Sequence, residues 1–311
     1  MKKVVTLGES MALFRSTEMG RLETKSSVSL GFGGAESNVA IGLARFGFDT
    51  TWISRLGDDA LGNLVGNGIR GQGVKPFIDR DPDCPTGLMV REVLRHGESK
   101  VYYYRTNSAA SYMQPKLVEG FDWSGTNLFH TTGITAAISV GGAQTVLAAL
   151  NLAKKSRAIC SYDINFRSKL ISPELAAENS MKALEFVDYF FGSEDEILLL
   201  SQETDVIRVA QNIAKAYGCT VVIKRAENGA IAVSETEIVE HVGRKVVPVD
   251  SVGAGDAFVA GFLAAVLQGF KIKPCLEFGH EFGAMSVLGP GDWESQPDPK
   301  DLFADAKDVA R

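Results

Sequence analysis

The sequence predicts an α/β fold in which helices cover both faces of a mainly parallel central sheet, with a small β-sheet lid beside it. Short apolar segments alternate with segments of helical periodicity at the start of the chain. The same alternation returns after residue 127, and the stretch between reads as extended chain. Alternating strands and helices favour a parallel sheet because each helix carries the chain back to the same end of the next strand.

The first part of the chain reads as two strand–helix pairs. Val4–Leu7 is a short apolar strand that ends at Gly8. Ala35–Phe46 places apolar residues at helical spacing, which suits a packed helix. Thr50–Leu56 then reads as the next strand and Leu61–Gly71 as the next helix.

The stretch 76–111 departs from this alternation. Leu88–Leu94 and Lys100–Arg105 are extended candidates joined by a turn at His96-Gly97-Glu98, as in an antiparallel hairpin. An inserted hairpin of this kind is typical of a lid or an interface element. We expect the lid to be formed by this stretch together with a segment near 10–32.

The second part of the chain returns to strands and helices. A long apolar helix is expected at Ala254–Leu267. Ser172 followed by proline is a typical helix start. The other strands are expected at Leu128–Thr131, Ala158–Asp163, Tyr189–Phe191, Val221–Lys224, Ile231–Val233 and Ile238–Val242, and the other helices at Gly142–Ala153, Pro173–Phe186 and Val206–Tyr217.

Length and composition favour one folded domain over residues 1–311. The 311 residues are 45% hydrophobic and 23% charged, an ordinary globular balance. The formal net charge is −6, and Lys and Arg are scattered, so no basic footprint for nucleic acid is present. A local anion site remains compatible with this charge, because the field of a cleft differs from the global charge.

Targeting and redox signals favour a cytoplasmic protein. The apolar run in the opening MKKVVTLGES is too short for a signal peptide, and no stretch of about 18 apolar residues predicts a membrane span. Four widely spaced cysteines form no C-x-x-C pair, which is typical of reduced, buried thiols. The four histidines lack the spacing of metal ligands.

The strongest local signal is the segment from Asp250 to Gly261, with the sequence DSVGAGDAFVAG. Glycine-rich backbone leads into a helix, whose exposed N–H groups and dipole favour an anion. Gly253 and Gly255 allow the backbone to approach a phosphate closely. Asp256 in the first turn could accept a hydroxyl proton. The alternative is that Asp256 only complements the helix dipole.

A second glycine-rich segment lies near the start of the chain. Gly33-Gly34 exposes backbone at a helix start, and Asn38 places an amide one turn inside. That amide could bind sugar hydroxyls. Alone, a glycine pair before a helix is usually only a turn.

Together the two segments resemble the signature motifs of the ribokinase-like (PfkB) carbohydrate kinases. The chain length, the separation of the motifs and the alternating pattern also fit, so the resemblance covers essentially the whole chain. It implies a three-layer α/β/α domain with a β lid over the sugar. Ser251 stands where the family more often has threonine, which keeps the hydroxyl.

The resemblance also implies roles for individual residues. Asp256 is expected to be the catalytic base, and Gly253, Ala254 and Gly255 the anion hole. Gly34 and Asn38 are expected to contact the sugar. Asp250 resembles residues that organise the sugar or a nearby monovalent cation such as K⁺.

Contacts to ATP and Mg²⁺ are implied by two further segments. Lys224, Arg225 and Gly229 lie in a segment similar to the family's strand and turn near the nucleotide phosphates. Glu196 resembles the Glu of the family's Asn-x-x-Glu motif, which acts near magnesium, although Ser193 replaces the usual Asn. Lys224 could instead be a solvated strand end and Glu196 an ordinary first-turn acid.

The residues expected at the sugar suggest an acidic substrate. Tyr103 and Arg105 share one face of an extended segment, and a guanidinium matches a carboxylate well. Arg167 ends the segment Asp163-Ile-Asn165-Phe-Arg167 and could also reach the cleft. Arg105 could instead be a solvated hairpin residue, and Asn165 and Arg167 could serve the nucleotide.

This combination of segments looks like the 2-keto-3-deoxygluconate kinases, which phosphorylate the terminal hydroxyl of that sugar acid. The resemblance implies ATP and Mg²⁺ as cofactors, a small sugar acid as substrate, and no nucleic acid or membrane partner. A homo-oligomer through the lid is also expected. The first alternative is a fructokinase or another neutral-sugar kinase, and the second is a non-catalytic sugar-binding sensor.

Overall fold

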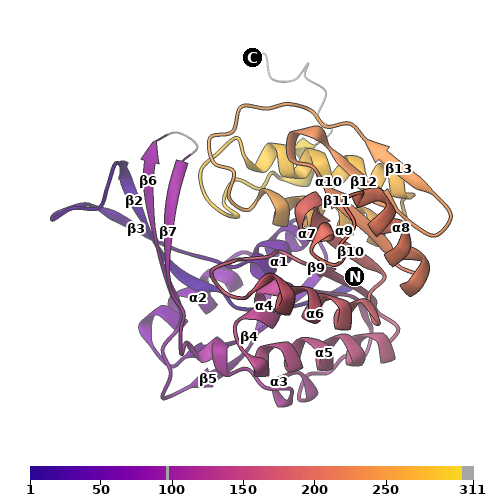
Figure 1. Cartoon of the computed structure of the whole chain (residues 1–311). Helices are drawn as coiled ribbons and strands as arrows, with labels where there is room; N and C mark the ends of the chain where they lie inside the picture. Colours follow the sequence, from indigo (N-terminus) through magenta and orange to yellow (C-terminus); the bar gives the residue numbers. More distant parts are fainter. Residues whose placement is uncertain (96–97, 303–311) are drawn as a thin grey trace.

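The computed structural model describes residues 1–95 and 98–302, and the turn expected at His96–Gly97 lies outside them. A nine-stranded sheet forms the centre of the molecule, in the order β13-β12-β11-β10-β9-β8-β1-β4-β5 (Figure 1). Its strands are β1 (Lys3–Leu7), β4 (Asp49–Gly57), β5 (Lys75–Asp81), β8 (Thr126–Thr132), β9 (Ile159–Asp163), β10 (Tyr189–Ser193), β11 (Thr220–Lys224), β12 (Ala230–Val233) and β13 (Ile238–His241).

The sheet is parallel from β11 to β5, and β12 and β13 continue it antiparallel at one edge. The inner strands β1, β8 and β9 are apolar and almost wholly buried, as expected where both faces are covered. After β1 the chain builds outward through β4 and β5, and it then returns to β8 on the other side of β1. This reversal opens a crevice beyond the carboxyl ends of β1 and β8, where α/β proteins bind ligands.

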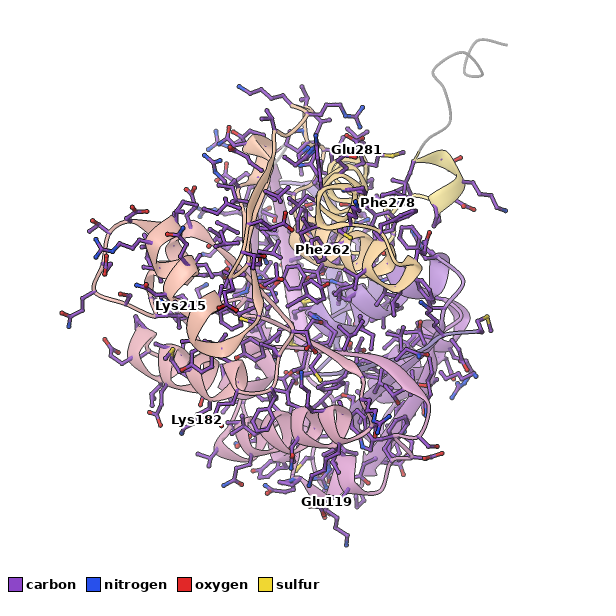
Figure 2. All side chains as sticks on the ribbon, turned by 90° about the vertical axis from the view of Figure 1, so that its right-hand side faces the viewer. Glu119, Lys182, Lys215, Phe262, Phe278 and Glu281 are labelled. Carbon is purple, nitrogen blue, oxygen red and sulfur yellow. The ribbon has the colours of Figure 1, made fainter. Side chains whose placement is uncertain are left out.

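Helices pack on both faces of the sheet, which confirms the predicted α/β class. Val146, Leu150 and Val209 belong to one buried cluster, and Leu43, Phe262 and Leu276 belong to a second. Figure 2 shows Phe262 inside the molecule, whereas Glu119, Lys182 and Lys215 project outward. The helices are α1 (Ala35–Arg45), α2 (Ala60–Gly71), α3 (Lys116–Glu119), α4 (Gly133–Ala137), α5 (Val140–Lys155), α6 (Pro173–Leu184), α7 (Glu194–Leu198), α8 (Val206–Tyr217), α9 (Ala254–Gln268) and α10 (Ile272–Ser286).

A second, four-stranded sheet projects from one side of the large sheet, at the left of Figure 1. Its strand order is β3-β2-β6-β7, and we call it the small sheet. The outer pairs are antiparallel, whereas β2 runs parallel to β6. Its strands are β2 (Met11–Met19), β3 (Val28–Gly33), β6 (Leu88–Arg95) and β7 (Glu98–Tyr104).

The stretch 76–111, expected to contribute to the lid, is divided between the two sheets. The stretch 76–111 begins inside β5, which pairs with β4 as the edge strand of the large sheet. Pro76 did not prevent this, because an edge strand has one side free of ladder hydrogen bonds. The part of this stretch that belongs to the small sheet begins at Leu88.

Helix α10, which packs more extensively on α9 than any other element does, was not predicted from the sequence. Pro274, Gly279 and Gly283 interrupt its helical pattern. Pro274 lies in the first turn, where a missing N–H costs little. The glycines allow close packing, because a Cβ on Gly279 would lie 2.9 Å from the carbonyl oxygen of Phe258. No helix in the described part of the chain is both long and apolar enough to cross a membrane.

Candidate active site

The candidate site lies where the carboxyl ends of the central strands meet the first turn of α9. Asp256 is in that turn, and Gly253 precedes the helix as its N-cap with φ 78°. This φ favours glycine, and a Cβ on Gly253 would lie 1.9 Å from the carbonyl oxygen of Asp292. The backbone from Gly253 through Ala254 to Gly255 therefore takes a path that side chains would obstruct. Its N–H groups stand at the positive end of a 15-residue helix.

The carboxylate of Asp256 is held by two side-chain amides. Asn38 on α1 donates from Nδ2 to Oδ2 at 2.8 Å, and Asn165 donates to Oδ1 at 3.5 Å. Burial raises the pKa of Asp256 to about 6, against the lowering effect of the Asn38 hydrogen bond. The neighbouring Asp163 raises this pKa further, and the cation of Arg167 lowers it. A carboxyl with this pKa is suited to accept a proton near neutral pH.

The start of α1 is packed against the end of β1. A Cβ on Gly34 would lie 2.2 Å from the carbonyl oxygen of Glu9, so this position requires glycine for close approach. Glu36 in the first turn is fully buried and accepts hydrogen bonds from Thr132 and Thr135, both at 2.6 Å. Burial raises the pKa of Glu36 to about 7. These contacts fix the turn that carries Asn38.

Lys224 lies at the carboxyl end of β11 and donates to Asp163 at the end of β9, at 2.5 Å. Burial works against the charge of Lys224, but the carboxylates of Asp163, Glu196 and Asp256 outweigh it and raise the pKa of the ammonium. Lys224 is thus a fixed positive charge between the strand ends and the turn at Gly255.

A cleft of about 820 Å³ opens beside this turn, which is large enough for a nucleotide. Five of the residues predicted to contact the nucleotide line it: Ser193, Lys224, Arg225, Gly229 and Gly255. Arg225 is paired with Glu194 at 2.9 Å and Glu240 at 2.8 Å. The rest of the wall comes mainly from the loop before α9 and from α10: Arg244, Lys245, Val246, Pro248, Ser251, Phe258, His280, Gly283, Ala284 and Val287.

Glu196 is committed to backbone groups. Its carboxylate accepts from the N–H of Ser193 and from the N–H of Phe166, both at 2.7 Å. Ser193 in turn caps α7, completing a reciprocal capping box. Glu196 therefore holds the loop that carries Asn165 against the start of α7. Within the described residues, no group of three His, Cys, Asp or Glu side chains could hold a metal ion.

The residues predicted to contact the sugar differ in their surroundings. Tyr103 is 45% exposed on β7, and Arg167 is exposed just beyond β9. Arg105 lies one residue beyond β7, is buried, and forms an ion pair with Glu9 in which Nε donates at 2.7 Å. Glu9 also accepts from Ser108 at 2.7 Å. The charge of Arg105 is therefore already countered within the chain.

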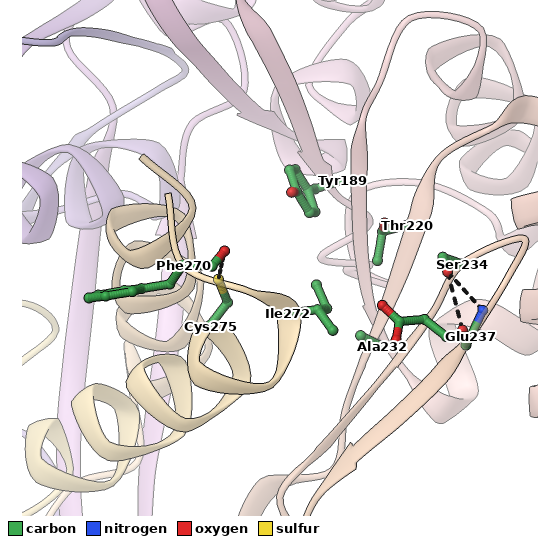
Figure 3. A pocket seen from close by; sticks show the side chains of 8 residues that line it. All are labelled: Tyr189, Thr220, Ala232, Ser234, Glu237, Phe270, Ile272 and Cys275. Carbon is green, nitrogen blue, oxygen red and sulfur yellow. Dashed lines mark hydrogen bonds between the residues drawn. The ribbon is translucent and has the colours of Figure 1, made fainter. Parts of the chain in front are cut away.

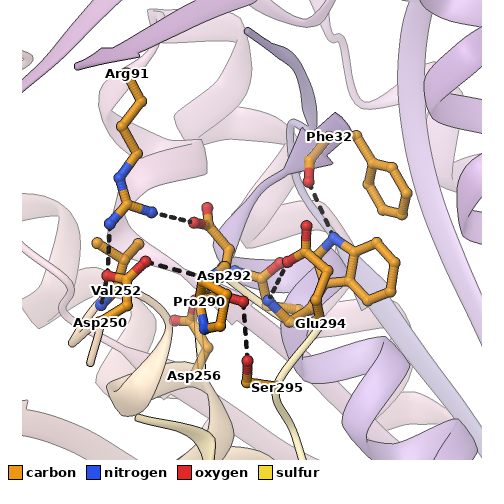
Figure 4. A network of polar contacts seen from close by, with 12 residues as sticks. Phe32, Arg91, Asp250, Val252, Asp256, Pro290, Asp292, Glu294 and Ser295 are labelled. Carbon is orange, nitrogen blue, oxygen red and sulfur yellow. Dashed lines mark hydrogen bonds and ion pairs between the residues drawn. The ribbon is translucent and has the colours of Figure 1, made fainter. Parts of the chain in front are cut away.

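Arg91 and Asp292 meet at the site, although neither was identified from the sequence (Figure 4). Arg91 on β6 contacts Asp250 at 2.5 Å and Asp292 at 3.2 Å. Burial raises the pKa of Asp292 to about 7, although Arg91 acts to lower it. Neither contact has a local sequence signal, because Arg91 is 159 residues from Asp250 and 201 residues from Asp292.

A smaller pocket of about 210 Å³ lies elsewhere, between the start of α10 and the antiparallel edge of the sheet (Figure 3). Tyr189 and Thr220 contribute to it from the amino-terminal ends of β10 and β11. These strand ends are opposite those that carry Asp163 and Lys224. This pocket is therefore separate from the candidate active site.

A buried carboxylate at a glycine-rich helix start, beside a nucleotide-sized cleft, is suited to phosphoryl transfer. The model of the pfkB family of carbohydrate kinases matches residues 1–299, and the chain belongs to this family. The predicted resemblance is thereby confirmed, and the chain is a sugar kinase that transfers a phosphoryl group to an alcohol.

Two curated relatives and one solved structure are similar over almost the whole chain. The 2-dehydro-3-deoxygluconokinase of Bacillus subtilis (strain 168) is 34% identical, over 94% of this chain and 92% of that protein. The 2-dehydro-3-deoxygalactonokinase of Haloferax volcanii is 31% identical, over 93% and 92%. The crystal structure of 2-dehydro-3-deoxygluconokinase from Thermotoga maritima has a TM-score of 0.87 and 27% identity, over 97% and 98%.

Proposed function

We propose that this kinase phosphorylates the terminal (6-) hydroxyl of 2-keto-3-deoxygluconate, using ATP and Mg²⁺, to give 2-keto-3-deoxy-6-phosphogluconate. The main support for phosphoryl transfer is the position of Asp256 at the start of α9, where Asn38 of α1 holds its carboxylate. The sugar-acid assignment is supported by the two relatives named for such substrates. 2-Keto-3-deoxygluconate is the compound that the name of the Bacillus subtilis relative calls 2-dehydro-3-deoxygluconate.

The residues present fit a nucleotide with its magnesium ion. The turn at Gly253–Gly255 directs backbone N–H groups toward the cleft, and Lys224 adds a positive charge. Magnesium usually keeps several waters and binds through phosphate oxygens with few protein carboxylates. ATP bound with magnesium would supply the phosphoryl group and neutralise part of its charge.

In the proposed reaction, Asp256 accepts the proton of the sugar hydroxyl as that oxygen attacks the γ-phosphorus of ATP and ADP leaves. Asn38 and Asn165 hold the carboxylate in place for this transfer. The N–H groups of the Gly253–Gly255 turn stabilise the negative charge that develops in the transition state. The small sheet excludes water from the site, so that Asp256 activates the sugar hydroxyl and ATP is not hydrolysed.

The substrate carboxylate is proposed to bind on the side of Tyr103, Arg105 and Arg167. Arg167 contributes most in this proposal, because it is exposed and no ion pair within the described ranges involves it. Arg105 would hold the carboxylate through the guanidinium nitrogen not used by Glu9. The proposal also places the enzyme in the cytoplasm, on the grounds of its separated, free cysteines.

Fructose is the second candidate substrate, and one contact favours it. The Glu9 carboxylate already counters the charge of Arg105, and binding of a neutral sugar does not require an unpaired guanidinium. A fructokinase of Vibrio alginolyticus is 27% identical over 90% of this chain. The non-catalytic sensor is not favoured, because sugar binding alone requires neither Asp256 nor the turn before it.

The decisive experiment measures steady-state phosphorylation of 2-keto-3-deoxygluconate, its galactonate epimer and fructose in parallel, with ATP and Mg²⁺. We expect kcat/KM for the sugar acids to exceed that for fructose by about a hundredfold or more, the size of a charge-assisted contact. Arg167→Gln should reduce this ratio, because kcat/KM for the sugar acids should fall by more than kcat/KM for fructose. A preference for fructose would reject the sugar-acid assignment and keep the kinase.

A further inference from the structure

One arginine joins the small sheet to the catalytic turn. Arg91 is on β6, on the face of the small sheet that also carries Tyr103, and only 4% of its surface is exposed. Its Nη2 contacts Asp250 and its Nη1 contacts Asp292 (Figure 4). The two carboxylates lie outside the small sheet, Asp250 in the loop before α9 and Asp292 in the loop after α10. This guanidinium therefore bridges the two loops. Among the described side-chain contacts, Arg91 is the one residue of the small sheet that binds both of them.

The two carboxylates support the turn at Gly253 from opposite sides. Asp250 accepts the N–H of Val252 at 3.2 Å, and its other oxygen accepts the N–H of Gly291 at 3.1 Å. The carbonyl oxygen of Asp292 lies directly against Gly253, where a Cβ would have no room. A movement of either aspartate would therefore displace the turn that precedes Asp256.

Charge explains why an arginine is needed at this point. Asp250, Asp256 and Glu294 all raise the pKa of Asp292, so the carboxylates repel one another, and Arg91 is the cation that opposes this. Removing one partner of a buried ion pair leaves an uncompensated charge, which is strongly unfavourable. The planar guanidinium binds two carboxylates through separate nitrogens, which a lysine ammonium does less well.

We propose that Arg91 is a positioning residue for phosphoryl transfer, which makes the geometry of the Gly253–Gly255 turn depend on contact with the small sheet. When the small sheet lies against the loops, Arg91 sets Asp250 and Asp292, and these set the turn. When it moves away, the two carboxylates lose their shared cation and the turn loosens. This inference rests on the family's kinase activity and not on the identity of the sugar.

The test compares Arg91→Gln and Arg91→Lys with Arg95→Gln, a control on the same strand whose arginine is exposed and paired with Glu98. We expect Arg91→Gln to lower kcat about a hundredfold, as misplacement of reacting groups does, with KM for ATP nearly unchanged. Sugar-independent ATP hydrolysis should rise relative to sugar phosphorylation. Arg91→Lys should recover only part of kcat, and Arg95→Gln should match the wild type.

A second readout does not depend on the sugar. Hydrogen–deuterium exchange at residues 250–256 should be faster in Arg91→Gln than in the wild type, whereas Arg95→Gln should leave it unchanged. An Arg91→Gln enzyme with kcat within threefold of the wild type and unchanged exchange would overturn the proposal. If no tested sugar is phosphorylated by the wild type, the proposed substrate fails, while the exchange result still decides the role of Arg91.

A third variant covers the case in which Arg91→Gln does not fold. Arg91→Gln/Asp292→Asn removes one of the carboxylates left without a cation, so it should fold more stably. The proposal expects this double variant to fold and still to show low kcat and fast exchange at the turn. Recovery of wild-type kcat would show that Arg91 only neutralises charge, and would reject a positioning role.

Discussion

Three carboxyl groups near the reaction centre have pKa values well above the ordinary range: Asp256 at about 6, and Glu36 and Asp292 at about 7. Burial is the main cause in each case. Such a group favours folding when it is protonated, and this contribution is lost as the pH rises through the raised pKa. The molecule therefore retains ionisable groups that oppose its stability at neutral pH, and Asp256 is the one with a direct chemical use.

Asp256→Asn should separate activity from stability. We expect kcat to fall by about 10²–10⁴-fold, because the proton acceptor is lost. The melting temperature should rise, since the buried charge is removed, and the gain should be larger at pH 8 than at pH 5. Calorimetry at the two pH values measures this difference. Near-normal kcat in this variant would exclude Asp256 as the base.

The rate should follow the ionisation of Asp256. A base must be deprotonated to act, so kcat/KM should increase with pH and level off above an apparent pKa near 6. Asn38→Ala removes a hydrogen bond that lowers this pKa, and should therefore move the profile to higher pH. The pH dependence of kcat/KM for both enzymes measures the shift. An unchanged midpoint would indicate that another group controls the profile.

At the scale of elements, the turn before α9 combines a left-handed residue with close packing. Gly253 and Gly47 both have positive φ, at 78° and 83°, but only Gly253 has backbone against the position of a Cβ. Asp292 supplies that backbone. Substitutions at the two positions therefore distinguish the effect of an unfavourable φ alone from the effect of displacing the turn.

Gly253→Ala should lower kcat about a hundredfold, which is the effect of losing a preorganised donor for developing charge. Gly47→Ala has the same backbone strain with nothing within 4 Å of the added methyl group. It should cost about 1–2 kcal/mol of stability and leave kcat unchanged. Equal loss of kcat in both variants would contradict the role assigned to the turn.

Local signals predicted the elements that depend on local chemistry. The Ser172–Pro173 start of α6 and the turn into α9 were recognised because the residues that define them are adjacent in the sequence. Contacts such as Arg91–Asp250 and Lys224–Asp163 were not predicted, because the fold brings these partners together from distant parts of the sequence. Arg105 was expected to face a ligand, and its ion pair with Glu9 could not be seen from residues 96 positions apart.

At the scale of the whole molecule, part of one face of the small sheet remains exposed. Leu30 is 58% exposed, Tyr104 63% and Tyr102 36%, and all three lie on the face opposite Tyr103. Exposed apolar patches of this kind often mark an interface. We propose that two copies associate through this face.

Tyr104→Glu together with Leu30→Glu should shift the molar mass in solution toward that of one chain, because charges would be buried in the interface. Light scattering after size-exclusion chromatography measures the mass. Val140→Glu, an exposed change at the start of α5 and outside the small sheet, serves as the control. A wild type of single-chain mass, or a double variant with unchanged mass, would reject this interface.

The small sheet also constrains how the chain can fold. Its parallel pair, β2 and β6, joins segments separated by α1, β4, α2 and β5. Such a pairing closes slowly, because the intervening chain must be ordered before the strands can meet. During synthesis the β2–β3 hairpin emerges first with an open edge, which is prone to wrong pairing until β6 arrives. Pulse-labelled hydrogen exchange should therefore find that β2 and β6 become protected late in refolding, after β1 and β4.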